Sequence, residues 1–147
     1  MKKIISKSVI ETENIAEKIS SFLKGDEVIA LFGDLGAGKT AFTRGLARGL
    51  GFCDGVSSPT FAIINEYNAR YPIYHFDMYR IKSEDDLYST GYYDYLHNGI
   101  VVIEWSENIE FALDNEKVIR VEIERGSFDD ERILKLYGDE KYENSWN

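Results

Sequence analysis

The sequence predicts an α/β fold of three layers, in which helices cover both faces of a central mixed β-sheet. A short continuous apolar run, Val28–Phe32, is typical of a strand that is buried on both faces, and it leads directly into a glycine-rich turn. After the turn, Phe42, Leu46 and Leu50 share one face of a helix that ends near Gly51. The order strand, turn, helix is a unit from which such folds are built.

Further helix and strand patterns flank this unit on both sides. Apolar residues at helical spacing predict an amphipathic helix over Glu11–Lys24, and Ser83 with the acidic residues after it resembles a helix start. Aromatic and β-branched residues, and alternation of apolar with charged side chains, predict the strands. The predicted strands are Phe61–Tyr67 and Ile73–Met78, which pair across a turn, then Ile100–Trp105, Ile119–Glu124, and Arg132–Tyr137, which could pair with Ile119–Glu124.

The length and composition favour one globular domain. At 147 residues, the chain can bury a single core and is too short for two. Apolar residues make up 44% and charged residues 29%, so we expect a folded chain. The lone Cys53 excludes an internal disulfide and a cysteine-rich zinc site. The single domain is expected to span residues 1–147, with residues 139–147 as a frayed polar tail.

Charge and hydropathy exclude two kinds of partner. The net charge of −9 repels nucleic acid phosphates, so any link to RNA is expected to run through a partner protein. The longest apolar runs fall far short of the roughly twenty residues that a membrane span requires, so no membrane partner is expected. The polar residues Ser6, Lys7 and Ser8 interrupt any signal peptide, and we therefore expect a cytoplasmic protein.

The glycine-rich turn matches a phosphate-binding loop, G-x-x-x-x-G-K-[ST], in the strand-to-helix context that this motif requires. The glycines allow successive backbone N–H groups to point at phosphate oxygens. Lys39 supplies a charge for the terminal phosphates, and Thr40 offers a hydroxyl to Mg²⁺. The alternative is a glycine-rich turn with a surface lysine, but the context favours a P-loop NTPase-like fold. The motif consists of Gly33, Asp34, Leu35, Gly36, Ala37, Gly38, Lys39 and Thr40.

Two carboxylates at predicted strand ends are candidates for the metal and the attacking water. Glu104 ends the apolar run Ile100–Ile103, where a carboxylate is costly to bury unless it has a partner such as Mg²⁺. A half-exposed glutamate at the strand end is the alternative. Asp77 ends the run Ile73–Phe76 and could orient water or hold the metal through water, although a helix or turn cap is its commoner role.

Three other features allow a structural reading beside a functional one. His75 is more often a satisfied strand histidine than a catalyst at such a position. The hydroxyls of Ser57–Phe61 could reach a γ-phosphate, but turn chemistry explains the segment equally well. Trp105 could simply pack in the core, as strand aromatics usually do.

Taken together, these segments resemble the TsaE family, also called YjeE, the ATPase component of bacterial tRNA threonylcarbamoyladenosine synthesis. The loop combined with an H-x-D-x-Y-R segment and an I-E-W segment is far more specific than the loop alone. The similar segments are Glu11-Thr12, Gly33–Thr40, Ser58–Phe61, His75–Arg80, Gly91–Leu96 and Ile103–Trp105.

The resemblance implies a role for individual residues. Lys39 and Thr40 would hold phosphate and magnesium, Glu104 would be the acidic metal ligand, and Asp77 would be important for hydrolysis, so Asp77, Glu104 and Lys39 form the expected catalytic set. Ala41 stands where the family often has a threonine, which leaves Thr40 as the only hydroxyl there. The residues expected to contact the nucleotide are Thr12, Gly33, Asp34, Leu35, Gly36, Ala37, Gly38, Lys39, Thr40, Ala41, Thr60, Trp105 and Arg132.

The resemblance also implies cofactors and partners. The expected cofactors are ATP and Mg²⁺, and the chain would be a weak ATPase that works with the TsaD and TsaB proteins. TsaD would perform the threonylcarbamoyl transfer, and tRNA would be reached only indirectly through that complex. ATP hydrolysis would reset or remodel the complex between turnovers.

Three other functions remain as alternatives. A small-molecule or nucleoside kinase would share the loop, but no long insertion is present to supply a mobile lid. A GTPase lacks support because no N-K-x-D segment occurs in the chain. A non-hydrolysing assembly factor that is merely stabilised by nucleotide is disfavoured by the retention of Lys39, Thr40 and Glu104.

Overall fold

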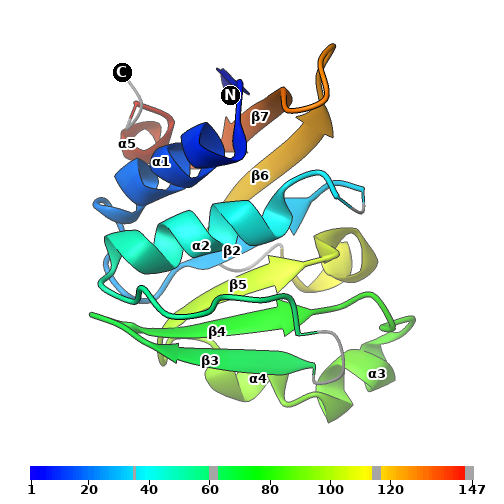
Figure 1. Cartoon of the computed structure of the whole chain (residues 1–147). Coiled ribbons are helices and arrows are strands. Elements are labelled where there is room, and N and C mark those ends of the chain that lie inside the picture. Colours follow the sequence, from blue (N-terminus) through cyan, green and yellow to red (C-terminus); the bar gives the residue numbers. More distant parts are fainter. Residues whose placement is uncertain (35, 60–62, 114–116, 145–147) are drawn as a thin grey trace.

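The computed structural model describes residues 1–34, 36–59, 63–113 and 117–144. Within these ranges the strands form one seven-stranded mixed sheet with helices on both faces, so the predicted three-layer α/β fold is confirmed (Figure 1). The strands are β1 (Lys2–Ser6), β2 (Val28–Phe32), β3 (Ile64–Asn68), β4 (Pro72–Asp77), β5 (Ile100–Glu104), β6 (Val118–Arg125) and β7 (Arg132–Tyr137). The helices are α1 (Val9–Ser20), α2 (Lys39–Gly49), α3 (Glu84–Ser89), α4 (Tyr92–Tyr95), the 3-10 helix η1 (Ser106–Ala112) and α5 (Glu140–Glu143).

The strand order β1-β7-β6-β2-β5-β4-β3 places the strand before the loop in the middle of the sheet. β4 is parallel to β5, and β2 is parallel to both β5 and β6. β1 with β7, β6 with β7 and β3 with β4 are antiparallel pairs. Because parallel strands end at the same edge of a sheet, the residues that follow β2, β4 and β5 converge. The register places Asp77 opposite Glu104 at that edge.

Two apolar clusters hold the layers together, one on each face of the sheet. On one face, Ile29 and Leu31 of β2 pack with Phe42 of α2 and with apolar residues of α1. On the other face, Ala30 of β2 packs with Leu87 of α3 and with α4 and η1. All five residues of β2 are buried, as its continuous apolar run predicts. No helix in the described ranges combines the length and the apolar character that a transmembrane segment needs.

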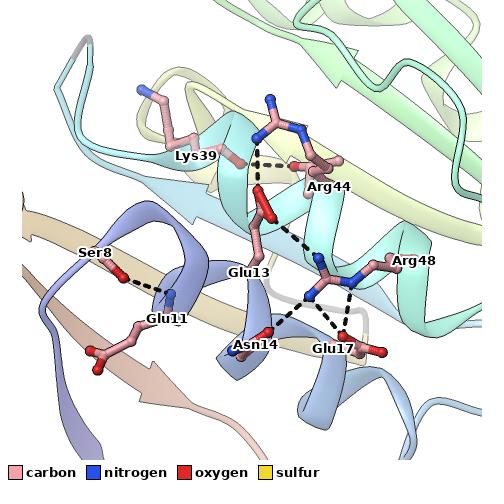
Figure 2. A network of polar contacts seen from close by, with 9 residues as sticks. Ser8, Glu11, Glu13, Asn14, Glu17, Lys39, Arg44 and Arg48 are labelled. Atoms are coloured by element: carbon pink, nitrogen blue, oxygen red, sulfur yellow. Dashed lines mark hydrogen bonds and ion pairs between the residues drawn. The ribbon is translucent and has the colours of Figure 1, made fainter.

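Helix α2, which begins at the end of the glycine-rich loop, is held closely against α1. A Cβ added to Gly45 would lie 2.1 Å from the carbonyl oxygen of Glu13. The Glu13 carboxylate accepts hydrogen bonds from Arg44 Nη1 at 3.0 Å and Arg48 Nη1 at 3.2 Å, and Arg48 Nη2 lies 2.7 Å from Glu17 Oε2 (Figure 2). The close approach and the ion pairs together fix α2, and therefore the loop before it, relative to the sheet.

Gly45→Ala is expected to destabilise the fold by about 1–3 kcal/mol, because the added methyl group overlaps the backbone of α1. In an open helix the same change would instead stabilise by roughly 1 kcal/mol. Urea unfolding of the variant measures the sign. Gly55→Ala is a matched control, since nothing lies within 4 Å of a Cβ built there. A Gly45→Ala protein as stable as the wild type would contradict the close contact.

The amino-terminal elements differ from the sequence prediction. Helix α1 begins at Val9, where Ser8 caps it by accepting a hydrogen bond from the Glu11 amide at 3.1 Å. It ends at Ser20, earlier than the predicted end at Lys24. Strand β1 is not predicted by the sequence pattern, and its place in the sheet comes from pairing with β7, which lies at the other end of the chain.

The prediction of a frayed tail over residues 139–147 is wrong for residues 140–143. These residues form α5, and Tyr142, which is 6% exposed, packs into the core. Its hydroxyl donates a hydrogen bond at 2.6 Å to the buried carboxylate of Glu27, which also accepts from three backbone N–H groups in residues 24–26. One buried tyrosine and its charged acceptor therefore anchor the segment. Residues 145–147 lie outside the described residues.

Candidate functional site

The glycine-rich loop joins β2 to α2 through backbone conformations that favour glycine. Gly33 has a φ of +150°, and a Cβ there would lie 2.5 Å from the carbonyl oxygen of Ile123 in β6. Gly36 and Gly38 have φ values of +78° and +116°, in the left-handed region. Larger residues at these positions would be strained or would collide with the sheet, so the shape of the loop requires the glycines of the motif.

The amino terminus of α2 can receive an anion. Gly38 is the N-cap residue, and no side chain caps the first turn. The first backbone N–H groups of a helix have no partner within it, and the helix dipole adds partial positive charge at this end. Lys39 and Thr40, the first two residues of α2, add an ammonium and a hydroxyl at the same point.

Lys39 is held between the loop and an aromatic ring. Its side chain is buried, and its ammonium donates a hydrogen bond to the carbonyl oxygen of Gly33. The same ammonium lies 4.2 Å from the centroid of the Trp105 ring, within the range of a cation–π interaction. These contacts keep a buried positive charge beside the open end of α2.

The backbone turns away from the direction of β5 at Trp105, the residue directly after Glu104. Its φ of +60° is uncommon for a residue other than glycine, and such backbone conformations cluster at functional sites. The turn places the indole beside Lys39 and 5.0 Å, ring centroid to centroid, from Tyr79. The predicted strand Ile100–Trp105 therefore ends one residue early, at Glu104.

Glu104 is buried and is held by a histidine on the neighbouring strand. Its Oε2 atom lies 2.6 Å from Nε2 of His75, and Nδ1 of His75 lies 2.9 Å from the hydroxyl of Tyr67. Both ring nitrogens of His75 are thus partnered, which agrees with a satisfied strand histidine. The other oxygen of Glu104, Oε1, makes no hydrogen bond with the described part of the chain.

Asp77 is half-buried at the end of β4, beside Glu104 in the register. Its Oδ1 atom accepts a hydrogen bond from the Tyr79 amide at 2.9 Å. Burial raises the pKa of the Asp77 carboxyl, and the negative charge of Glu104 raises it further, while the Tyr79 hydrogen bond, His75 and Lys39 oppose the shift. Because its surroundings disfavour the charged form, the Asp77 carboxyl at the end of β4 is a candidate functional group.

Asp77→Asn is expected to be at least as stable as the wild type at about pH 7. An acid whose pKa is raised by folding contributes stability at low pH that is lost as the pH rises from its ordinary value, here 3.8, through the folded value. Asparagine does not titrate, and its oxygen can still accept from the Tyr79 amide. Thermal unfolding of both proteins from about pH 3 to pH 8 tests the sign, and a variant less stable than the wild type at neutral pH would contradict it.

A cavity of about 610 Å³ brings the loop, the start of α2 and the ends of β4 and β5 together. This volume is in the range typical of small-molecule sites. The expected catalytic residues Lys39, Asp77 and Glu104 all line it, and so do Thr40 and Trp105. The full lining consists of Gly36, Gly38, Lys39, Thr40, Ala41, Ser58, Asp77, Tyr79, Glu104 and Trp105.

Several residues expected to contact nucleotide do not line this cavity. Thr12 is buried, and its hydroxyl lies 2.7 Å from that of Ser6. Gly33, Asp34 and Ala37 line a smaller cavity against β6. Leu35 and Thr60 lie outside the described residues.

Arg132 donates hydrogen bonds to carbonyl oxygens of the glycine-rich loop and does not line the cavity. Its Nε donates to the carbonyl oxygen of Ala37 at 2.9 Å, and its Nη2 donates to that of Gly36 at 3.3 Å. Direct contact between Arg132 and a nucleotide stays a prediction. Arginine at the start of β7 reaches the loop because β7 pairs with β6, which no local pattern around Arg132 indicates.

Sequence reasoning missed two residues that the structure places at the site. Tyr79 lines the cavity, and its signal was its position in the H-x-D-x-Y-R segment. Glu107, in η1, accepts a hydrogen bond from the Gly33 amide at 3.2 Å. No motif marks Glu107, because its place depends on the turn at Trp105.

The side chains lining the cavity fit magnesium and phosphate chemistry. Mg²⁺ prefers oxygen ligands and usually takes one or two carboxylates together with substrate phosphates. Thr40, Glu104 and Asp77 supply a hydroxyl and two carboxylates in one cavity. No cluster of three or more histidine, cysteine or acidic side chains suited to a metal occurs among the described residues. The hydroxyl and the two carboxylates therefore fit a metal that is held jointly with a phosphate ligand.

Comparison with known sequences identifies relatives over most of the chain. The family model described as threonylcarbamoyl adenosine biosynthesis protein TsaE matches residues 6–134. The tRNA threonylcarbamoyladenosine biosynthesis protein TsaE of Bacillus subtilis is 42% identical over 135 residues, which cover 90% of this chain and 84% of that protein. The protein of the same name from Aquifex aeolicus is 36% identical over 133 residues, covering 82% of this chain and 96% of its own.

A solved structure supports the same relationship. The crystal structure of Bacillus subtilis YdiB matches with a TM-score of 0.75 and 37% sequence identity, covering 98% of this chain and 90% of that one. The likeness supports a P-loop-like fold for this mixed sheet. With the family model spanning most of the sequence, the chain belongs to the TsaE family, whose role is in tRNA threonylcarbamoyladenosine biosynthesis.

Proposed function

We propose that this chain binds ATP with Mg²⁺ and hydrolyses it in support of tRNA N6-threonylcarbamoyladenosine synthesis. The observation that carries the proposal is the convergence of Lys39, Thr40, Asp77 and Glu104 on one cavity at the amino terminus of α2. An ammonium, a hydroxyl, two carboxylates and free helical N–H groups are the parts that phosphoryl transfer requires.

The loop and α2 bind the phosphates of ATP. Backbone N–H groups at the start of α2 donate to phosphate oxygens, and the ammonium of Lys39 interacts with the terminal phosphates. Trp105, beside Lys39, covers one side of this site. The chain has no N-K-x-D segment, so a preference for guanine lacks its usual support.

Thr40 and Glu104 would hold Mg²⁺, which would supply positive charge against the negative charge that develops on the phosphates during transfer. Glu104 presents Oε1 while Oε2 stays with His75. Asp77 orients the attacking water, since its carboxylate lies beside Glu104 at the same edge of the sheet. Its raised pKa makes it a stronger base than an ordinary aspartate.

The partners we propose are the TsaB and TsaD proteins, with the threonylcarbamoyl transfer carried out by TsaD. A net charge of −9 supports an indirect relation to tRNA, because the chain has no basic excess to hold it. Such a role would be carried out in the cytoplasm, where the tRNA substrate of that complex is made. Hydrolysis would reset the complex between turnovers.

The test is ATP hydrolysis measured while the matching TsaB–TsaD complex is titrated in, with and without Mg²⁺. We expect a slow basal rate that rises to saturation with the complex and disappears when EDTA removes the metal. A rate that is indifferent to the complex would contradict the partner-coupled role. Transfer of the γ-phosphate to a small acceptor instead of water would favour a kinase.

A further inference from the structure

Two side chains, those of His75 and Tyr67, connect the carboxylate of Glu104 to the backbone of Ser57. His75, which is fully buried, contacts Glu104 Oε2 through Nε2 at 2.6 Å and the hydroxyl of Tyr67 through Nδ1 at 2.9 Å. The same hydroxyl donates a hydrogen bond to the carbonyl oxygen of Ser57 at 3.0 Å. A continuous chain of hydrogen-bonding atoms therefore runs from Glu104 to Ser57.

The sheet register creates this chain. His75 lies two residues before Asp77 on β4, so its side chain points to the same face as those of Asp77 and Glu104. Tyr67, on the antiparallel strand β3, is diagonal to His75 in the register and reaches it across the same face. Its ring also packs against Phe52, with centroids 5.0 Å apart. The Tyr67 side chain is thus held in place by packing as well as by hydrogen bonds.

The proton arrangement fixes the direction of one bond. An ionised carboxylate only accepts, so Nε2 of His75 carries a hydrogen and donates it to Glu104. Burial raises the pKa of the Tyr67 phenol, which therefore keeps its hydrogen, and that one hydrogen is shared between Nδ1 of His75 at 2.9 Å and the carbonyl oxygen of Ser57 at 3.0 Å. With one oxygen of Glu104 engaged by His75, the carboxylate is held in a single orientation that leaves Oε1 for a ligand.

The Ser57 end of this series of hydrogen bonds also lies next to the cavity. Ser57 precedes Ser58, which is among the residues that line the cavity. A shift of this segment would move the carbonyl oxygen of Ser57 and hence its bond to Tyr67. Two parts of the cavity wall, Glu104 and Ser58, are therefore joined through the buried pair His75 and Tyr67.

We propose that His75 and Tyr67 are positioning residues that set the orientation of Glu104 and couple it to the Ser57–Ser58 segment. The inference rests on the proposed function, because Glu104 is taken as the magnesium ligand. Neither residue lines the cavity, so neither is a catalytic group. Removing a group that hydrogen-bonds to a metal-ligating residue typically lowers metal affinity or activity by about 10–100-fold.

The kinetic test compares three substitutions. His75→Leu is expected to lower kcat and to raise the Mg²⁺ concentration for half-maximal rate by about 10–100-fold, with KM for ATP changed far less. His75→Gln, whose amide can still donate to Glu104, restores part of the rate. Tyr67→Phe is expected to lower kcat and to raise the Mg²⁺ concentration for half-maximal rate by about threefold or more. The effect is smaller than that of His75→Leu because Tyr67 acts on Glu104 only through His75.

Tyr67→Phe keeps the proposal testable even if the His75→Leu protein fails to fold. The phenylalanine keeps the ring contact with Phe52, and Asn65 Nδ2 still donates to the Ser57 carbonyl at 3.1 Å. Tyr74→Phe is the matched control, because Tyr74 packs on the opposite face of β4 against Tyr95. A Tyr67→Phe protein with the kcat and magnesium dependence of the Tyr74→Phe control would overturn the proposal.

A spectroscopic measurement separates this inference from the proposed ATPase activity. The chain has two histidines, so ¹⁵N-histidine NMR with His97→Gln for assignment isolates the signals of His75. We expect the Nε2–H signal to move in Glu104→Gln, and the Nδ1 signal to move in Tyr67→Phe. Signals unchanged in both would overturn the link. A wild-type protein without ATPase activity would contradict the proposed function, and the NMR signals would still decide the link.

Discussion

Lys39→Ala is expected to weaken binding of Mg-ATP by at least about 100-fold, because it removes the charged donor to the terminal phosphates. Lys39 is the buried ammonium of the cavity lining, and its present partners are a carbonyl oxygen and the face of Trp105. Loss of two charge-assisted hydrogen bonds of about 1.5–3 kcal/mol each accounts for the size of the effect. Calorimetric titration with ATP and Mg²⁺ measures the dissociation constant directly.

The fluorescence of Trp105 offers a second way to measure the binding of Mg-ATP. The chain has two tryptophans, so in a Trp146→Phe background the fluorescence comes from Trp105 alone. Because the Lys39 ammonium lies over its ring, a change in that contact when phosphate binds should alter the emission. The signal should respond to Mg-ATP in the Trp146→Phe protein and not in the same protein carrying Lys39→Ala.

Lys117→Ala is the matched control for the loss of a lysine. Lys117 is exposed, lies 3.5 Å from Asp26 in an ion pair, and precedes β6 at the opposite end of the sheet from the loop. Its removal should leave the dissociation constant unchanged. Equal binding by the Lys39→Ala and Lys117→Ala proteins would contradict the assignment of the loop as the phosphate site.

The central part of the fold could be predicted because its signals are local. The apolar run Val28–Phe32 coincides with β2, and the glycines that follow it need no distant contact to be recognised. The convergence of Asp77 and Glu104 also follows from the sequence, once both are placed at the ends of parallel neighbouring strands. Local pattern therefore marks the loop and the two carboxylates that line the cavity.

The parts that could not be predicted depend on contacts between distant residues. β1 joins the sheet only by pairing with β7, and the tail is ordered by the bond between Tyr142 and Glu27. Arg132 reaches the loop through the pairing of β7 with β6, so its role behind the loop cannot be read from its neighbours in sequence. Interactions of this kind leave no periodic or compositional trace near the residues that make them.

The histidine beside Glu104 shows the limit within the site itself. An isolated His75 in a strand is ambiguous from sequence, because the pattern gives its face but not its partners. The register of β4 with β5 places it next to Glu104, and that of β3 with β4 brings Tyr67 to its other nitrogen. Residues that line a site can be predicted from a motif, whereas residues that orient them require the register.

Glu104→Gln is expected to lower the single-turnover rate of ATP hydrolysis by on the order of 100-fold or more while leaving ATP affinity nearly unchanged. Glutamine has the shape of glutamate, and its oxygen can still accept from Nε2 of His75, so the fold and the packing are retained. It lacks the negative charge that holds Mg²⁺, and the phosphates remain bound by the loop and by Lys39. The two effects should therefore separate.

Glu110→Gln is the control for the loss of a negative charge, since Glu110 pairs with Arg120 at 2.8 Å and does not line the cavity. If Glu104 acts through the metal, raising the Mg²⁺ concentration should recover part of the rate of Glu104→Gln and have little effect on the Glu110→Gln protein. If Glu104 only supports the structure, extra metal would not help, and the variant would unfold at a lower temperature than the control. Rate recovery without a loss of thermal stability is thus the result that assigns Glu104 to magnesium, and hydrolysis unchanged by the substitution would remove it from the site.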